Sequence, residues 1–275
     1  MRTIPFTKMS GTGNDFIMVD NRAGLLKEGE APALARAACP QRVSVGADGL
    51  ILVEKASKPG HDLRMRIFNA DGSEAEMCGN GSRCFAVFAR TLGAAGNQQT
   101  LDVIPGTLNA AVAADNMSAK VQLSLPTPIE KRSGVDVLGE SVELYFLNTG
   151  VPHAIRFVKD VSKIDVKIIG ACIRYHEAFK PKGTNANFVE IVNSQTIKIR
   201  TYERGVEDET LACGTGSCAA AIAAAYAHGC KSPVRVIAGG GELTIHFELD
   251  GLQASRPILE GAVDTVYAGE YFWRG

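Results

Sequence analysis

Two cysteines occur in closely similar glycine-rich strings that lie far apart in the chain. The strings are Met77-Cys78-Gly79-Asn80-Gly81-Ser82-Arg83-Cys84 and Ala212-Cys213-Gly214-Thr215-Gly216-Ser217-Cys218. The offset, 213 minus 78 or 135 residues, is nearly half of the 275-residue chain. Each string is followed by an apolar run typical of a helix. Each of the two cysteines is therefore expected at the point where a loop enters a helix.

A cysteine at a helix start has a particular chemistry. The unpaired N–H groups and the positive end of the helix dipole favour thiolate over thiol. The same N–H groups can hold a carboxylate, and glycine lets a ligand approach the backbone closely. If the two halves face each other across a cleft, one thiolate could remove an α-proton while one thiol delivers a proton to the opposite face. The repeat thus predicts inversion of an α-carbon without a cofactor.

Other uses of the cysteines and glycines are less consistent with the sequence. Cys39, Cys172 and Cys230 are interpreted as packing residues, as are Cys84 and Cys218 inside the apolar runs. Seven cysteines form an odd set, which favours thiols over a disulfide framework. Zinc is not expected, because no histidine stands beside the cysteine pairs. Nucleotide binding is weakly supported, since neither a G-x-G-x-x-G string after a strand nor a P-loop is present.

The elements around the two strings repeat as well. The expected helices run from Phe85 to Leu92 and from Ala219 to His228, and a glycine follows each. They have almost no polar face, which indicates burial. Strand-like stretches precede both strings, at Leu63 to Asn69 and Thr196 to Glu203, and further short strands lie around them.

These observations predict an α+β fold of two pseudo-symmetric domains. Each domain is expected to be a curled, mostly antiparallel sheet wrapped around a central buried helix. Residues 1–125 plus 260–275 form the half with Cys78, and residues 126–259 form the half with Cys213. The prolines at 126 and 128 mark the crossover between the halves.

Composition excludes several classes of protein. An apolar share of 45% and a charged share of 21% are typical of an ordinary globular chain. The net charge is -1, so no general attraction to nucleic acid or to an anionic membrane is expected. No apolar run approaches the length of a membrane span, and the N-terminus turns polar early. A cytoplasmic protein that recognises a small molecule is predicted.

Several longer strings resemble a known family. They are Lys8-Met9-Ser10-Gly11-Thr12-Gly13-Asn14-Asp15-Phe16, the segment from Phe68 to Gly81, Asn148-Thr149-Gly150-Val151-Pro152-His153, and the segment from Tyr202 to Gly216. Together they resemble the diaminopimelate epimerases, which are cofactor-independent two-cysteine enzymes, and the similarity runs from end to end. The related proline racemases would be expected to show Met-Cys-Gly-His-Gly at the first cysteine, where this chain has Asn80.

The resemblance implies a reaction, an assembly and a set of site residues. The reaction is epimerisation of LL-2,6-diaminopimelate to meso-diaminopimelate by a thiolate and a thiol, in lysine and peptidoglycan precursor synthesis, by a homodimer with no cofactor and no metal. Cys78 and Cys213 would be the catalytic acid and base, and His153 and Glu203 would tune their pKa values. The implied substrate-binding residues are Asn14, Asn69, Gly79, Asn80, Asn185, Glu203, Arg204, Gly214 and Thr215.

Two departures and two alternatives remain at this point. Some family members have asparagine where this chain has Val151, and glutamine where it has Gly49. These differences affect how the substrate is bound and do not involve the two cysteines. The alternatives are a racemase for another amino acid and an amino-acid binding module without chemistry. Arg204 favours a substrate with a second carboxylate.

Overall fold

The computed structural model describes residues 1–275, and the chain divides into two compact units. Unit 1 comprises Met1–Val121 and Gly261–Gly275, and unit 2 comprises Gln122–Glu260. The divisions fall within strands β8 (Ser118–Gln122) and β17 (Gln253–Ala262). No helix combines the length and the apolar composition needed to span a bilayer.

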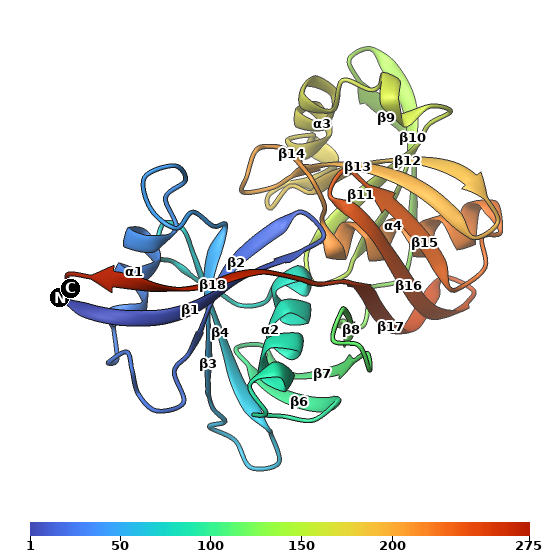
Figure 1. Cartoon of the computed structure of the whole chain (residues 1–275). Helices are drawn as coiled ribbons and strands as arrows, with labels where there is room; N and C mark the ends of the chain where they lie inside the picture. The colour runs from blue at the N-terminus through green and yellow to red at the C-terminus, as the bar shows by residue number, and fades with distance from the viewer. The chain divides into compact units, whose positions relative to one another are not determined.

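Unit 1 contains two helices and most of its strands precede the second one. Its elements are β1 (Arg2–Gly11), β2 (Asn14–Asp20), α1 (Glu30–Ala38), β3 (Gly49–Lys55), β4 (Leu63–Asn69), β5 (Glu74–Ala75), α2 (Gly79–Thr91), β6 (Gln98–Val103), β7 (Gly106–Val112), β8 and β18 (Asp264–Trp273). β18 pairs antiparallel with β1 and matches Arg2 with Trp273, so the chain termini lie side by side in Figure 1.

Unit 2 repeats this order with its own two helices. Its elements are β9 (Glu130–Val137), β10 (Glu140–Asn148), β11 (Pro152–Phe157), η1 (Val161–Lys163), α3 (Val166–Arg174), η2 (Glu177–Phe179), β12 (Asn185–Asn193), β13 (Thr196–Glu203), β14 (Asp208–Thr210), α4 (Gly214–His228), β15 (Val234–Ala238), β16 (Gly241–Asp250) and β17.

The strand pairings repeat along with the elements. In unit 1, β1–β2, β3–β4, β4–β5 and β6–β7 are antiparallel, and β2–β3 and β4–β6 are parallel. In unit 2, β10–β11, β12–β13, β13–β14 and β15–β16 are antiparallel, and β11–β12 and β13–β15 are parallel. The predicted fold class, two similar α+β halves with mostly antiparallel sheets, is confirmed.

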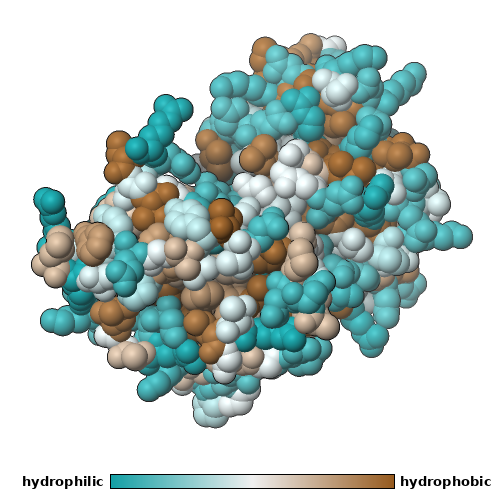
Figure 2. Space-filling model, in the orientation of Figure 1, coloured by the Kyte–Doolittle hydropathy of each residue, from teal (hydrophilic) through white to brown (hydrophobic).

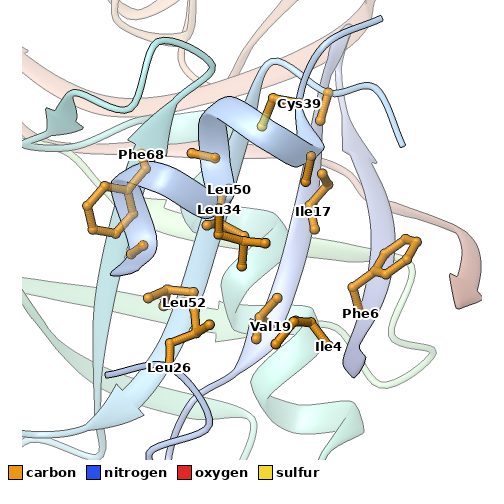
Figure 3. Close-up of a cluster of buried hydrophobic side chains, with 14 of the residues drawn as sticks. Ile4, Phe6, Ile17, Val19, Leu26, Leu34, Cys39, Leu50, Leu52 and Phe68 are labelled. Atoms are coloured by element: carbon orange, nitrogen blue, oxygen red, sulfur yellow. The ribbon is translucent and has the colours of Figure 1, made fainter. Parts of the chain in front are cut away.

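In unit 1, strands β2 and β3 are buried on both faces because a helix covers each face. On β2 and β3, Ile17 and Leu50 belong to the cluster under α1, whereas Phe16 and Ile51 face Gly81 of α2. Figure 3 shows the α1 side, with Leu34 of the helix over the side chains of β2 and β3. Strands covered on both faces carry continuous apolar runs rather than alternating patterns.

The same layering holds in unit 2. Val166 and Ile173 of α3 belong to one buried cluster with Phe188 of β12 and Tyr202 of β13. The other helix, α4, packs against β10–β13, β15 and β16, as Figure 1 shows. Residues 216–224 of α4 are all buried, so the expectation of a helix with no exposed face is confirmed for most of its length.

The structure matches the expected ends of two strands but moves the starts of both expected helices. The strands predicted at Leu63–Asn69 and Thr196–Glu203 are β4 and β13 with the same ends. Both helices begin earlier than the apolar runs, directly after Cys78 and Cys213. Gly229 ends α4 in the left-handed conformation with φ 68°, as predicted. The sequence reasoning did not identify α1 and α3.

Close packing of α3 generates a stability prediction. A methyl group added at Gly170 would lie 2.4 Å from Cβ of Tyr202, which is below any tolerable contact. Gly170→Ala should therefore lower the free energy of unfolding by about 1–3 kcal/mol, because neither the helix nor β13 can shift freely. Urea titration measures this, with Gly239→Ala as control, since its nearest neighbour would be at an ordinary 3.5 Å. Equal stability of the two variants would contradict the packing argument.

Candidate functional site

Cys78 is the N-cap residue of α2. Its backbone is extended (φ -141°, ψ 118°), and its Sγ accepts a hydrogen bond from the Gly81 N–H at 3.4 Å. The hydroxyl of Ser82 donates to the Cys78 carbonyl at 2.8 Å, which fixes the first turn. A sulfur that accepts from a helix N–H lies in an environment that favours thiolate. The expected cysteine at a helix start is therefore present in unit 1.

Two predicted asparagines meet beside Cys78. The Asn80 amide donates to Oδ1 of Asn14 at 2.7 Å, and the Asn14 amide donates to Asp48 at 2.9 Å. Gly11, at the end of β1, packs so closely that an added Cβ would lie 3.0 Å from the Asn80 carbonyl. The β1–β2 hairpin and the start of α2 thus hold Asn14, Gly79 and Asn80 next to the cysteine.

Asn69, by contrast, bonds within its own turn rather than to this group. It ends β4, is exposed, and donates to the Ser73 hydroxyl at 2.9 Å. In the β3–β4 ladder it lies opposite Gly49, one of the two positions that depart from the family pattern. An added Cβ at Gly49 would lie 2.8 Å from the Phe68 carbonyl. In the described arrangement, a glutamine could enter this position only if the two strands separated.

Cys213 occupies the corresponding position in unit 2. It is the N-cap of α4 with extended backbone (φ -120°, ψ 109°) and is 8% exposed. Its Sγ lies 3.5 Å from the Thr215 hydroxyl, which lies 3.0 Å from Nε2 of His153. Unit 2 thus joins three predicted site residues in one row of polar atoms.

The hydrogen bonds around His153 determine its tautomer. The Asn187 amide donates to the Ala154 carbonyl and to Nδ1 of His153, both at 3.2 Å, while its Oδ1 accepts from Thr201. Nδ1 is therefore an acceptor, so the neutral ring carries its proton on Nε2 and donates to Thr215. The Thr215 hydroxyl is then left with its own proton to donate toward Cys213.

Helix α4 approaches this row at a glycine. An added Cβ at Gly216 would lie 2.6 Å from Oδ1 of Asn187 and 3.2 Å from Cε1 of His153. Only a residue without a side chain lets the first turn of α4 rest on the asparagine–histidine pair. Gly216 therefore has a packing role that its place in the repeated string did not reveal.

Three further predicted residues lie along β12 and β13. Asn185 is opposite His153 in the β11–β12 pairing, donates to the Pro152 carbonyl and accepts from the Arg204 N–H at 2.7 Å. Glu203 accepts from the Thr210 hydroxyl at 2.9 Å. Burial raises the pKa of the Glu203 carboxyl, and the bond from Thr210 offsets part of that rise. The site residues of unit 2 thus come from β11–β13 and the start of α4.

The cysteines assigned to packing are largely buried. Cys39, Cys84, Cys218 and Cys230 are buried, and Cys172 is half-buried against the core of unit 2. Burial raises the pKa of Cys84 and of Cys218 to about 12, so both remain protonated near neutral pH. Their interpretation as packing residues is confirmed by this burial.

Sequence reasoning missed three polar side chains that hold the site. They are Asn187 and Thr201, which orient His153, and Arg83, which lies behind the start of α2. A signal for Asn187 existed, because it follows Asn185 by two residues and so falls on the same face of the strand. Arg83 lies in the glycine-rich string just before the apolar run, where the pattern gave no indication that its charge is buried.

The burial of His153 predicts a pH dependence of stability. Burial lowers the pKa of His153 from 6.5 to about 3, so the unfolded chain binds this proton at a higher pH than the folded protein. Its contribution is complete above pH 6.5 and is lost as the pH falls toward 3, at about 1.4 kcal/mol per pH unit. In urea titrations from pH 7.5 to 4.5, His153→Gln should remove this slope. The exposed His228→Gln should retain it, and equal slopes for both variants would refute the assignment.

Known proteins share both the sequence and the fold of this chain. The family described as Diaminopimelate epimerase matches residues 6–127 and 145–264. A diaminopimelate epimerase of Aquifex aeolicus (strain VF5) is 46% identical over 274 residues, with 96% of each chain covered. One from Methanocella arvoryzae is 39% identical over 281 residues, covering 98% of this chain and 97% of the relative.

Solved structures of lower identity share the fold. A Bacillus anthracis phenazine biosynthesis protein of the PhzF family has a TM-score of 0.75 at 18% identity, with 99% of this chain and 100% of that one covered. A hydroxyproline epimerase from Agrobacterium vitis has a TM-score of 0.71 at 15% identity, with 98% and 91% covered. The nearly full-length sequence similarity decides the assignment: the chain belongs to the diaminopimelate epimerase family.

Proposed function

We propose that this protein interconverts LL-2,6-diaminopimelate and meso-diaminopimelate, with Cys78 and Cys213 as the two proton carriers. Membership of the family supports the substrate. The observation that carries the chemistry is that each unit places a cysteine as the N-cap of a largely buried helix. The product would serve lysine and peptidoglycan precursor synthesis, and we assign the enzyme to the cytoplasm.

The mechanism uses the two cysteines in different protonation states. One thiolate removes the α-proton, and the other thiol delivers a proton to the opposite face of the carbon. The substrate carboxylate gains negative charge as the proton leaves. N–H groups at the helix starts, at Gly79–Asn80 and Gly214–Thr215, would stabilise that charge as it forms. Neither step requires a redox change.

The remaining residues implied by the family resemblance would bind the substrate or adjust the pKa values of the thiols. We assign Asn14, Asn69, Asn185, Glu203 and Arg204 to the substrate, with Arg204 pairing with the distal carboxylate and Glu203 facing an ammonium group. The structure gives His153 a direct hydrogen bond to Thr215, which supports a tuning role through that hydroxyl. Glu203 could tune a thiol only over a longer range, since its hydrogen bond goes to Thr210.

Cysteine substitutions test the two-base mechanism. Cys78→Ala and Cys213→Ala should each lower kcat by about 10²–10⁴-fold or more, because each removes a proton carrier. Cys172→Ala, a half-buried cysteine outside the site, should keep full activity. Turnover is followed by deuterium uptake from D2O at the α-carbon of LL- and meso-diaminopimelate, with proline, hydroxyproline and glutamate in parallel. Exchange confined to another amino acid would reject the substrate, and full activity of either alanine variant would reject the mechanism.

We also propose that the protein is a homodimer. β18 pairs with β1, and its contacts with other strands are few in comparison. The strand exposes Val266, Tyr267 and Phe272, at 56%, 45% and 59% of their surface. Figure 2 shows exposed apolar side chains interspersed among hydrophilic ones on the face it displays. Exposed apolar side chains gathered on one strand favour burial against a second copy.

Sedimentation equilibrium tests the assembly. The expected mass is twice 29.2 kDa, or about 58 kDa. Phe272→Glu should shift the protein to monomer, because it places a charge on the exposed strand. Val43→Glu, at a residue that is 84% exposed outside β18, should leave the dimer intact. A monomeric wild-type protein would refute the proposal.

A further inference from the structure

Arg83 is a fully buried cation behind the first turn of α2. Its side chain is 0% exposed and is among the largest fully buried side chains of the protein. One terminal nitrogen donates to the Gly79 carbonyl at 3.2 Å and to Oδ1 of Asn80 at 3.1 Å. The other donates to the Thr12 hydroxyl at 2.8 Å. The guanidinium therefore holds the two residues that directly follow Cys78.

Every hydrogen-bond acceptor of this guanidinium is neutral. Its Nε is buried and has no partner, and no carboxylate forms an ion pair with it. Burying a charge without a counter-charge costs several kcal/mol even after relaxation. Arginine cannot relieve this cost by releasing its proton near neutral pH. The fold therefore keeps a positive charge at the start of α2 that its own carboxylates do not neutralise.

Two thiols lie close enough to the charge to interact with it, and only one of them is fully buried. These groups are the thiols of Cys84 and Cys78. Burial raises the pKa of Cys84 to about 12, with Asp264 of β18 adding to the rise, so Cys84 remains a thiol. Cys78 is half-exposed and accepts from the Gly81 N–H. Of the two thiols, Cys78 is therefore the one on which the buried cation can act.

The charged groups on the neighbouring strands do not replace this pairing. Lys8 of β1 bonds to Asp15 of β2, and Asp15 and Asp48 are joined through hydrogen bonds to each other's backbone. Asp48 reaches the start of α2 only through the neutral amide of Asn14, which bonds to Asn80. The lysine is thus already balanced by carboxylates, whereas Arg83 is not.

We propose that Arg83 is a positioning residue whose buried, unneutralised guanidinium holds Cys78 as the thiolate and fixes Gly79 and Asn80 beside it. The inference deepens the proposed function, because it assigns the charge that prepares one of the two proton carriers. Aligning Cys78 with Cys213 places Cys218 opposite Arg83. The start of α4 therefore has a buried thiol where the start of α2 has a cation.

The experiment measures thiol ionisation directly and does not require turnover. Iodoacetamide alkylation of the folded full-length protein is followed from pH 5 to 10, and mass spectrometry resolves the peptides of Cys78 and Cys213. In Arg83→Met, the midpoint of the Cys78 profile should move up by about one pH unit or more, so that its rate at pH 7 falls severalfold. The rate for Cys213 should change less than twofold. Arg83→Lys keeps the charge and should stay within about threefold of wild type for Cys78.

Controls separate a charge effect from a packing effect. Arg90→Met removes a half-buried arginine from the last turn of the same helix and should leave the Cys78 profile unchanged. An unchanged profile in folded Arg83→Met, or equal shifts at both cysteines, would overturn the proposal. If Arg83→Met does not fold, the wild-type profile decides, because an ionisation of Cys78 at or above the ordinary pKa of about 8.5 is incompatible with a stabilised thiolate. An inactive protein with the expected ionisation would reject the proposed function and leave this inference standing.

Discussion

The unsatisfied N–H groups at the start of a buried helix are the constraint on which both units depend. A helix surrounded by sheet cannot leave its first-turn donors buried without partners, because each such donor would cost about 1–3 kcal/mol. In unit 1 a sulfur accepts from one of these donors, at Gly81. In unit 1 the cysteine thus caps the helix and is at the same time exposed to the positive end of its dipole, whereas in unit 2 the Cys213 side chain makes no such cap bond. The N-cap position of α2 is therefore both the place that needs an acceptor and the place that favours a reactive thiol.

Burial on both faces explains how much of the fold the sequence could predict. The runs Phe16–Val19 and Leu50–Val53 are apolar without alternation, which is typical of strands covered by helices on both sides. Their short length and flanking glycines still distinguish them from helices, and the repeated Cys-Gly-x-Gly-Ser strings position α2 and α4. The positions of β4 and β13 follow directly, because turn residues delimit them.

The outer helices and the buried polar contacts could not be derived in the same way. α1 has a glycine N-cap with no side-chain hydrogen bond, so it lacks the usual side-chain start signal. α3 carries Val166, Ile168, Ile169 and Ile173, and β-branched residues of this kind favour strands in isolation. Both helices exist because the sheet has a second apolar face to cover. The hydrogen bonds of Asn187 and Arg83 depend on that packing and have no periodic signal.

A duplicated backbone alone does not determine which of the two thiols carries the proton in two-base chemistry. The side chains around each cysteine make the two positions different. The proposed mechanism needs one thiolate and one thiol at the same time, and two identical helix starts would not decide which sulfur is the thiolate. Here the repeated backbone is flanked by unequal groups. A buried cation stands behind Cys78, whereas a neutral His153 and the Thr215 hydroxyl stand beside Cys213. A very large difference between the pKa values of the two thiols would slow the reverse reaction, in which the two cysteines exchange the roles of base and acid. Cys213 thus retains a hydroxyl donor, which can stabilise its thiolate by a hydrogen bond without a neighbouring charge.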